Sequence, residues 1–241
     1  MENDLNSGSR AVTAAMVIIG DELLSGRTQD LNLHFLAQNL TQIGIDMGEV
    51  RIVPDIEEEI INAVNFLRKK FDYVFTSGGI GPTHDDITSA AIAKAFGDKL
   101  IKNDEGERIL IKHYGAKNVN EARLKMAFIP ESASLLDNPI SSAPGFRIGN
   151  VFVMAGIPTI FQAMFEAAKS ELVGGAKTES REIKISATES VIAKDFSDLQ
   201  KKYPQVVMGS YPFESGTSLV FRGKDVSMLE LAVSEMRNLL K

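Results

Sequence analysis

The sequence has no cysteine and no long hydrophobic run among its 241 residues. Without cysteine it cannot form disulfides, thiolate zinc sites or a cysteine nucleophile. The longest strongly apolar stretch, residues 14–19, is too short to cross a bilayer. The polar first thirteen residues lack the apolar core of a signal peptide. We therefore expect a cytoplasmic protein without a membrane partner.

Basic residues are also few, since 26 Lys and Arg stand against 32 Asp and Glu and the formal net charge is −6. Nucleic-acid binding depends on a basic surface, so the composition argues against a nucleic-acid partner. Hydrophobic residues make up 44% of the chain, which is ordinary for a globular protein. A chain of this length can bury a core without crosslinks.

Four common signatures of catalytic or binding sites are missing. The chain contains neither GxxxxGKS nor GxxxxGKT, and its glycine-rich segment has His84 where a dinucleotide-binding fingerprint has its third glycine. No GxSxG occurs, which argues against an esterase. His34, His84 and His113 are too scattered for a zinc site.

Apolar strands alternate with helical patterns over residues 12–174. Strands are predicted at 14–19, 48–53, 73–75 and 151–154, and helices at 33–43, 56–70, 86–96, twice within 104–127, and at 159–172. Strands that alternate with helices form parallel sheets covered on both faces. We therefore predict a three-layer α/β/α sandwich with a mostly parallel sheet.

Both ends of the chain are set apart from this domain. Residues 1–11 are predicted to be a disordered tail. Beyond a glycine-containing linker, residues 177–241 are predicted to form a small α+β appendage with strands at 182–188, 205–210 and 217–222 and helices at 192–202 and 225–240. The pattern leaves open whether this region is a separate domain or extends the main sheet.

Glycine follows three of the four apolar strands, at Gly20, at Gly78 and Gly79, and at Gly156. In open α/β sheets, ligands bind outside the carboxyl ends of the strands. Glycine lets backbone N–H groups approach a ligand there, and the next helix presents its positive end to an anion. Each glycine alone is explained by a turn, but together they predict a site for a phosphorylated ligand.

The segment from Thr76 to Thr88 joins a glycine-rich loop to two adjacent carboxylates, Asp85 and Asp86. Carboxylates repel bound phosphates unless a divalent cation bridges them, an arrangement typical of magnesium-dependent phosphoryl or nucleotidyl chemistry. The structural alternative is a helix start, with Thr83 and Asp86 as a capping box or Asp85 as N-cap.

These residues resemble the molybdopterin-binding (molybdenum-cofactor biosynthesis) domain family. The resemblance covers residues 12–172 and rests on GDELLSG at 20–26, Asp30 and Asn32, and GGIGPTHDDIT at 78–88. It is strongest to the N-terminal domain of the competence/damage-inducible protein CinA and to the domain linked to FAD synthases, and residues 208–212 (MGSYP) also resemble the latter. The second, amidohydrolase domain of CinA is expected to be absent. Ser141 and Ala155 stand where the family usually has glycine and proline.

The resemblance implies catalytic roles for Asp86 and Asp55, with Asp85 beside them. It also implies metal-dependent hydrolysis, of ADP-ribose near CinA and of FAD in the FAD-synthase-linked domain. The predicted metal ligands are Asp86 and Asp85, and the predicted cofactor is a divalent ion (Mg, Mn or Co). Asp55 has an alternative interpretation as N-cap of the 56–70 helix, in a capping box with Glu58.

The predicted substrate contacts come from the strand-end loops and from a further family loop near residue 142. They are Gly20, Asp21, Glu22, Asn32, Ser77, Gly78, Gly79, Gly81, Thr83, His84, Thr88, Ser142, Gly145, Gly156 and Pro158. Asp21 and Glu22 have an alternative interpretation as exposed loop charges. Tyr211 is either part of a turn or an aromatic platform for a flat ligand.

The expected function is a metal-dependent pyrophosphatase for ADP-ribose-like nucleotide diphosphates. The alternatives are a non-catalytic protein that binds molybdopterin or another pterin, and a molybdopterin adenylyltransferase. Simple adenylyltransferases of this family are short single domains, so residues 177–241 favour the CinA-like branch. The expected partners are a small-molecule nucleotide or pterin and further copies of the chain in a homo-oligomer.

Overall fold

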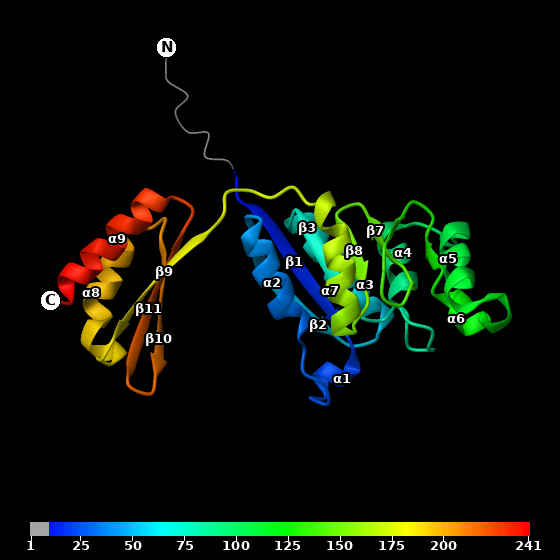
Figure 1. The fold of residues 1–241 in the computed structure, drawn as a ribbon, viewed down its shortest axis with the longest axis horizontal. Coiled ribbons are helices and arrows are strands. Elements are labelled where there is room, and N and C mark those ends of the chain that lie inside the picture. The colour runs from blue at the N-terminus through cyan, green and yellow to red at the C-terminus, as the bar shows by residue number, and fades with distance from the viewer. Residues whose placement is uncertain (1–9) are drawn as a thin grey trace, which may run out of the picture. The chain divides into compact units, whose positions relative to one another are not determined.

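The computed structural model describes residues 10–241, which divide into two compact units after Gly175 (Figure 1). Residues 1–9 of the tail predicted at 1–11 lie outside the described residues. Arg10 forms an ion pair with Asp72, and β1 begins at Val12. No helix in the described part of the chain has the length and apolarity needed to cross a membrane.

A six-stranded sheet organises the first unit, with the order β2-β1-β3-β8-β7-β6. Its strands are β1 (Val12–Ile19), β2 (Ile45–Val53), β3 (Tyr73–Ser77), β6 (Ser134–Leu136), β7 (Gly145–Ile148) and β8 (Val151–Met154). The pairs β1·β2, β1·β3 and β3·β8 are parallel, whereas β7 and β6 continue the sheet in antiparallel pairing. The mostly parallel sheet is confirmed, and β6 and β7 are additions that the sequence patterns did not predict.

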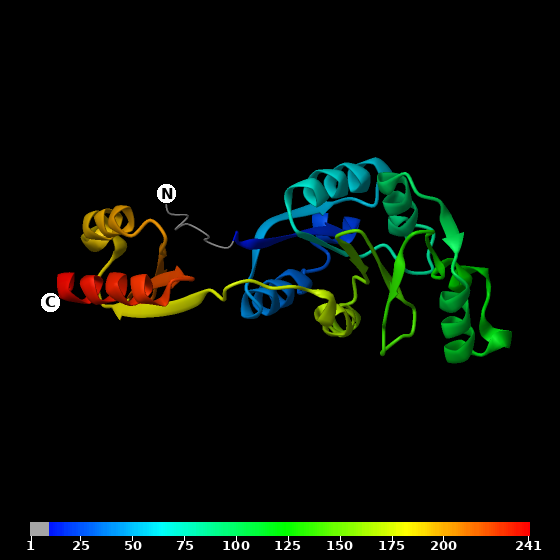
Figure 2. The same cartoon turned by 90° about the horizontal axis from the view of Figure 1, so that it is seen from above.

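Helices cover both faces of this sheet, which confirms the three layers. α3 (Glu57–Lys70) and α4 (Thr88–Phe96) pack on one face, and α2 (Asn32–Gln42) and α7 (Pro158–Ala168) on the other (Figure 2). Along β1, alternate side chains enter the two cores, with Val17 on one face and Met16 on the other. A strand buried on both faces has to be apolar at every position, which explains the run at 14–19.

Short elements complete the first unit. They are α1 (Asp21–Leu24), β4 (Leu100–Lys102), α5 (Asp104–Tyr114), a 3₁₀ turn at Ala116–Asn118, α6 (Glu121–Lys125), β5 (Phe128–Pro130) and a 3₁₀ turn at Lys169–Glu171. The two helices predicted within 104–127 are α5 and α6. The side chain of Asn103 caps α5 and that of Asn120 caps α6, each by accepting a backbone N–H of the first turn.

The capping interpretations of the acidic residues are wrong. The N-cap residue of α3 is Ile56 and makes no side-chain cap, because the Oδ2 atom of Asp55 accepts the backbone N–H of Asp21 instead (3.0 Å). α4 begins only at Thr88, after Ile87, so neither Asp85 nor Asp86 caps it. The first residues of the predicted 86–96 helix belong to the loop that follows β3.

The second unit has its own sheet, which answers the question that the sequence left open. It comprises β9 (Glu179–Ile185), α8 (Glu189–Lys202), β10 (Val207–Phe213), β11 (Gly216–Gly223) and α9 (Val226–Leu239), and the sheet is antiparallel with the order β10-β11-β9. Leu219 and Phe221 of β11 are buried in a core with residues of α8 and α9. Tyr211 lies within β10 and not in a turn.

A chain that ends at Gly175 is expected to fold, with a melting temperature within a few degrees of the first transition of the full protein. The apolar cores of the first unit draw only on residues before 175, and that of the second only on residues after it. Gly175 is retained because its N–H donates to the carbonyl of Gly44 (3.3 Å). Scanning calorimetry measures the transition, and a truncated protein without a cooperative transition would contradict this boundary.

Candidate functional site

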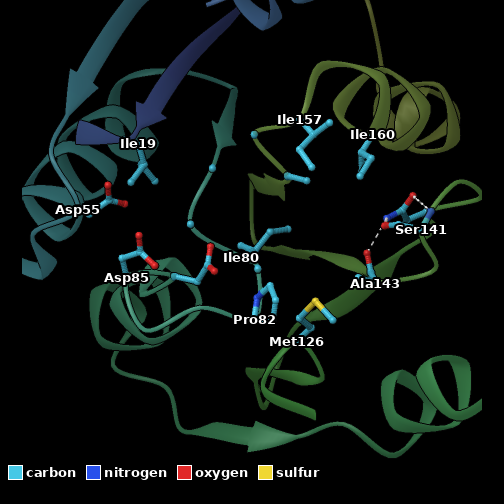
Figure 3. A pocket seen from close by; sticks show the side chains of 18 of the residues that line it. Ile19, Asp55, Ile80, Pro82, Asp85, Met126, Ser141, Ala143, Ile157 and Ile160 are labelled. Carbon is cyan, nitrogen blue, oxygen red and sulfur yellow. Dashed lines mark hydrogen bonds between the residues drawn. The ribbon is translucent and has the colours of Figure 1, made fainter. Parts of the chain in front are cut away.

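A cavity of about 710 Å³ lies at the carboxyl ends of β1, β3 and β8 (Figure 3). Ile19 and Gly20 reach it from the end of β1, Gly78 and Gly79 from β3, and Gly156 from β8. Its volume is in the range of small-molecule sites in proteins. The crevice expected from glycine at three strand ends is therefore present in the structure.

Glycine is required where these strand ends meet. Gly78 has φ +107°, and a Cβ atom there would lie 2.3 Å from the carbonyl oxygen of Ile19. Its N–H donates to the carbonyl of Met154 (3.1 Å), and a Cβ on Gly156 would lie 3.3 Å from the Cα of Gly78. Any side chain at Gly78 would push these strand ends apart.

The glycine loop after β3 leaves backbone donors unused. Within residues 10–241 no hydrogen-bond acceptor reaches the N–H groups of Gly79, Ile80 and Gly81. Thr88, which is fully buried, holds the loop from behind by donating its N–H to the carbonyl of Gly79 and its hydroxyl to that of Gly78 (both 3.0 Å). Free N–H groups in a turn form a concave site for anions.

A second set of hydrogen bonds fixes the acidic end of this loop. The Oδ2 atom of Asp86 accepts the backbone N–H (2.7 Å) and the hydroxyl (2.5 Å) of Thr83. Lys125 of α6 donates to the carbonyl of Thr83. Among the described residues no donor reaches the other oxygen of Asp86, Oδ1, which is therefore free for a ligand.

Four carboxylates line the cavity, those of Glu22, Asp55, Asp85 and Asp86. Burial raises the pKa of Asp55, the Asp21 N–H lowers it, and the negative charges of Asp21, Glu22 and Asp85 raise it further; the net pKa lies above the ordinary value. A carboxyl with a raised pKa binds a proton more readily than a free aspartate. Acidic neighbours around it also create an attractive field for a cation.

No complete metal cage is present, since no group of three or more His, Asp or Glu residues within 10–241 is arranged to hold a metal ion. Mg²⁺ commonly takes only one or two carboxylates from the protein and completes its shell with water and substrate phosphates. Asp85 and Asp86 fit that limited role, so their assignment as metal ligands stays a prediction.

Apolar side chains form the rest of the wall. Ile157 and Ile160 lie above Ile80 and Met126 in Figure 3, on the side of the cavity opposite Asp55. Ile157 is 59% exposed, which is unusual for isoleucine and leaves an apolar surface open to a ligand. One wall thus suits charged groups and the other suits an apolar or planar group.

The structure brings ten of the eighteen predicted site residues to the cavity wall. They are Gly20, Glu22, Asp55, Gly78, Gly79, Gly81, Asp85, Asp86, Gly156 and Pro158. The other eight do not line it: Asp21, Asn32, Ser77, Thr83, His84, Thr88, Ser142 and Gly145.

Most of these eight residues support the wall from behind. The buried Asn32 amide donates to the Ser77 hydroxyl and to the carbonyl of Gly156 (both 2.8 Å), which ties the loops after β3 and β8 together. A Cβ on Gly145 would lie 2.5 Å from the carbonyl of Val153, so that glycine is needed for strand packing. The His84 side chain is 99% exposed, and its Nδ1 atom lies 3.9 Å from Oδ1 of Asp85.

Several residues of the cavity wall were not among the predicted site residues. They are Thr28, Tyr114, Arg123, Met126, Asn138, Ser141, Ala143 and Ala155, together with Ile19, Ile80, Pro82, Ile157 and Ile160 at the strand ends. Asn138, Ser141 and Ala155 lie in loops that the family resemblance had already marked. The Asn138 amide donates to Ser141 Oγ (2.6 Å) and to the carbonyl of Ala143 (2.8 Å), as Figure 3 shows.

Replacing Asp55 by asparagine should increase the free energy of unfolding relative to the wild type. This increase should be larger at pH 7.5 than at pH 4. A raised folded-state pKa means that the folded protein holds the proton above the pH at which the unfolded chain releases it. Stability is then lost as pH rises through that window, and the variant avoids this loss. Asparagine still accepts the Asp21 N–H. Thermal melts across pH measure the difference.

The matched control is Asp98→Asn. Hydrogen bonds from Ser132 lower the pKa of Asp98, so its contribution is present at high pH and lost as pH falls. The free energy of unfolding of Asp98→Asn, relative to the wild type, should therefore fall as the pH rises, whereas that of Asp55→Asn should increase. A difference for Asp55→Asn that stays constant with pH would contradict the raised pKa.

The mostly parallel sheet, with glycine loops and carboxylates around a strand-end cavity, defines an α/β protein with a candidate small-molecule site. The family model described as a probable molybdopterin binding domain matches residues 15–174, and the model described as the middle domain of FAD synthase matches residues 177–241. The chain belongs to the molybdopterin-binding domain family, which confirms the resemblance seen in its motifs.

Three similar proteins illustrate this relationship. A protein from Archaeoglobus fulgidus is 32% identical over 93% of this chain and 96% of its own length. A probable FAD synthase from Caenorhabditis elegans is 30% identical over 95% of this chain but only 50% of that protein. The crystal structure of CinA, of unknown function, from Thermoplasma acidophilum has 33% identity and a TM-score of 0.64 over 67% of this chain and 98% of its own.

Proposed function

We propose that this protein hydrolyses the diphosphate linkage of a nucleotide diphosphate such as ADP-ribose or FAD, with the help of a divalent cation. The observation that supports this proposal is that one cavity combines a glycine loop with free N–H groups and four carboxylates. Phosphate needs donors and positive charge, whereas a hydrolytic water needs a base. Both kinds of group line the same cavity.

The glycine loop is suited to the diphosphate. The N–H groups of Gly79, Ile80 and Gly81, which no acceptor within residues 10–241 occupies, can donate to phosphate oxygens. A phosphate bound there would replace water on these donors without disturbing any hydrogen bond of the fold. Thr88 keeps the loop in place from behind.

Asp55 is the group best suited to accept the proton of an attacking water. Its Oδ2 atom already accepts the Asp21 N–H, which orients the carboxylate and leaves Oδ1 as the basic atom. Its raised pKa makes it a stronger base than a free aspartate. Asp55 enters the cavity from the loop after β2, beside the glycine loop.

Asp86, through its free Oδ1, and Asp85 would hold the cation. When bound, a divalent ion would neutralise the charge of the phosphates, which four carboxylates would otherwise repel. The hydrogen bonds from Thr83 fix the position of Asp86, and Lys125 fixes Thr83 in turn. The loop is therefore held by the fold before any ligand binds.

A second candidate is binding of molybdopterin or a related pterin without turnover. The description of the matching family favours it, and so does the apolar wall of Ile157 and Ile160, against which a planar ring system can pack. Adenylyl transfer to molybdopterin is the catalytic variant of this candidate.

The deciding experiment incubates the full-length protein with ADP-ribose or FAD and with Mg²⁺, Mn²⁺ or Co²⁺. Chromatography detects the mononucleotide products, and a sample with chelator is the control. Product formation that depends on the metal is the expected result. Pterin binding by calorimetry with no nucleotide turnover would support the second candidate and overturn the first.

Light scattering on the same samples measures the molecular mass, which should be that of the expected homo-oligomer.

A further inference from the structure

Arg123 is the only basic side chain in the wall of the cavity, counted over residues 10–241. It belongs to α6, whose N-cap Asn120 accepts the backbone N–H of Arg123 itself (3.0 Å). Its guanidinium carbon lies 4.2 Å from the centre of the Tyr114 ring, and Nη1 donates to the carbonyl of Asn118 (2.6 Å). Tyr114 also lines the cavity. The guanidinium is thus held in a defined place by an aromatic ring and a carbonyl.

The charge of Arg123 has no carboxylate partner within the described residues, whereas Arg108 pairs with Glu105 and Arg147 with Glu171. A guanidinium carries five N–H donors, and the contact to Asn118 uses only one of its nitrogens. The remaining donors form a planar fork that matches the oxygens of a phosphate. An unpaired cation in a cavity lined by carboxylates marks the place of a negatively charged ligand group.

The segment that carries Arg123 is attached to the glycine loop. Lys125, two residues further on, donates to the carbonyl of Thr83, whose N–H and hydroxyl donate to Asp86. Met126 follows directly and lies across the cavity from Asp55 in Figure 3. The position of Arg123 is therefore fixed relative to the glycine loop and away from the base.

We infer that Arg123, supported by Tyr114, is the anion-binding residue that selects phosphorylated ligands by contacting a phosphate of a bound nucleotide diphosphate. This inference rests on the proposed function. Within residues 10–241 Arg123 supplies the side-chain positive charge that the wall otherwise lacks, and the glycine N–H groups of the same cavity can donate to the same phosphates. The alternative is a purely structural arginine that holds the 116–118 turn through Asn118.

The test compares Arg123→Gln with Arg123→Lys and with the matched control Arg108→Gln, an exposed arginine on α5 outside the cavity wall. Calorimetry measures the binding of ADP-ribose, adenosine and inorganic pyrophosphate to each full-length protein. Melting temperatures are measured in parallel, and KM and kcat wherever turnover is found.

Arg123→Gln is expected to weaken ADP-ribose and pyrophosphate binding about 10- to 100-fold, the effect of losing charge-assisted hydrogen bonds. Adenosine affinity should stay the same, KM should rise more than kcat falls, and Arg123→Lys should recover part of the loss. Arg108→Gln should match the wild type. Unchanged affinities for ADP-ribose and pyrophosphate in Arg123→Gln would overturn the inference, as would an equal loss for all three probes together with a lower melting temperature.

Pyrophosphate separates this inference from the proposed function. Binding of pyrophosphate that depends on Arg123, without hydrolysis of any nucleotide, would overturn the proposed function and leave the anion-binding role standing. A wild-type protein that binds neither pyrophosphate nor ADP-ribose would overturn both. Hydrolysis that is equally efficient in wild type and Arg123→Gln would support the function and reject the role of Arg123.

Discussion

Replacing Asp86 by asparagine is expected to lower metal-dependent turnover by about two orders of magnitude or more, with a melting temperature within about 2 °C of the wild type. The two effects separate because Asp86 has two oxygens with different tasks. Oδ2 accepts the N–H and hydroxyl of Thr83, whereas Oδ1 is the atom left for a cation. Asparagine keeps one oxygen as an acceptor for Thr83 but loses the charge that would hold the metal.

Asp98→Asn is the matched control for this prediction. The Oδ2 atom of Asp98 accepts the N–H (2.9 Å) and hydroxyl (2.6 Å) of Ser132, the same pair of bonds that Asp86 makes with Thr83, but Asp98 does not line the cavity. Turnover in Asp98→Asn should equal that of the wild type. If Asp86→Asn keeps full activity at saturating metal, its role is confined to holding the loop, and the catalytic assignment fails.

The sequence predicted the fold and the site best at positions where only one kind of residue can satisfy the local structure. The unbroken apolar run before Gly20 predicted a strand covered on both faces, and β1 is such a strand, with residues 14–19 all buried. Glycine after three strands predicted the cavity, because only glycine permits the approach seen between Gly78 and Ile19. Strands β6 and β7 were not predicted because they are short and not uniformly apolar: β6 begins with an exposed serine and β7 contains Gly145 and Arg147. The equally short β8 was predicted because all four of its residues are apolar.

The acidic residues show where predictions of helix caps from local residue spacing fail. Asp55 and Asp86 both have the spacing of helix caps, yet neither caps the helix that follows it: Asp55 accepts the N–H of Asp21, the first residue of α1, and Asp86 accepts that of Thr83 in a loop. The spacing of a capping box and of a loop closure is the same in sequence, and only tertiary structure separates them. Arg123 and Tyr114 were missed for a related reason, since nothing in α5 and α6 indicates which face meets the cavity.

The largest effect on stability is expected for Gly78→Ala, which should destabilise the first unit by about 3 kcal/mol or more. Two costs add at this position. The φ angle of +107° is unfavourable for any residue with a Cβ atom, and that atom would lie 2.3 Å from the carbonyl oxygen of Ile19. The backbone has to move, because the contact is with a main-chain oxygen that no side-chain rotation can relieve.

Gly97→Ala isolates the conformational part of this cost. Gly97 follows α4 with φ +65°, but a Cβ atom there has nothing within 4 Å, so alanine should cost only about 1 kcal/mol. Calorimetry should show a fall of about 2–4 °C for Gly97→Ala and at least twice that for Gly78→Ala. Gly78→Ala should also weaken ADP-ribose binding, because relief of the contact displaces the ends of β1 and β3 that line the cavity, whereas Gly97→Ala should bind normally. Equal losses of stability in the two variants would show that the strand ends have room to separate, and that the cavity does not depend on glycine at position 78.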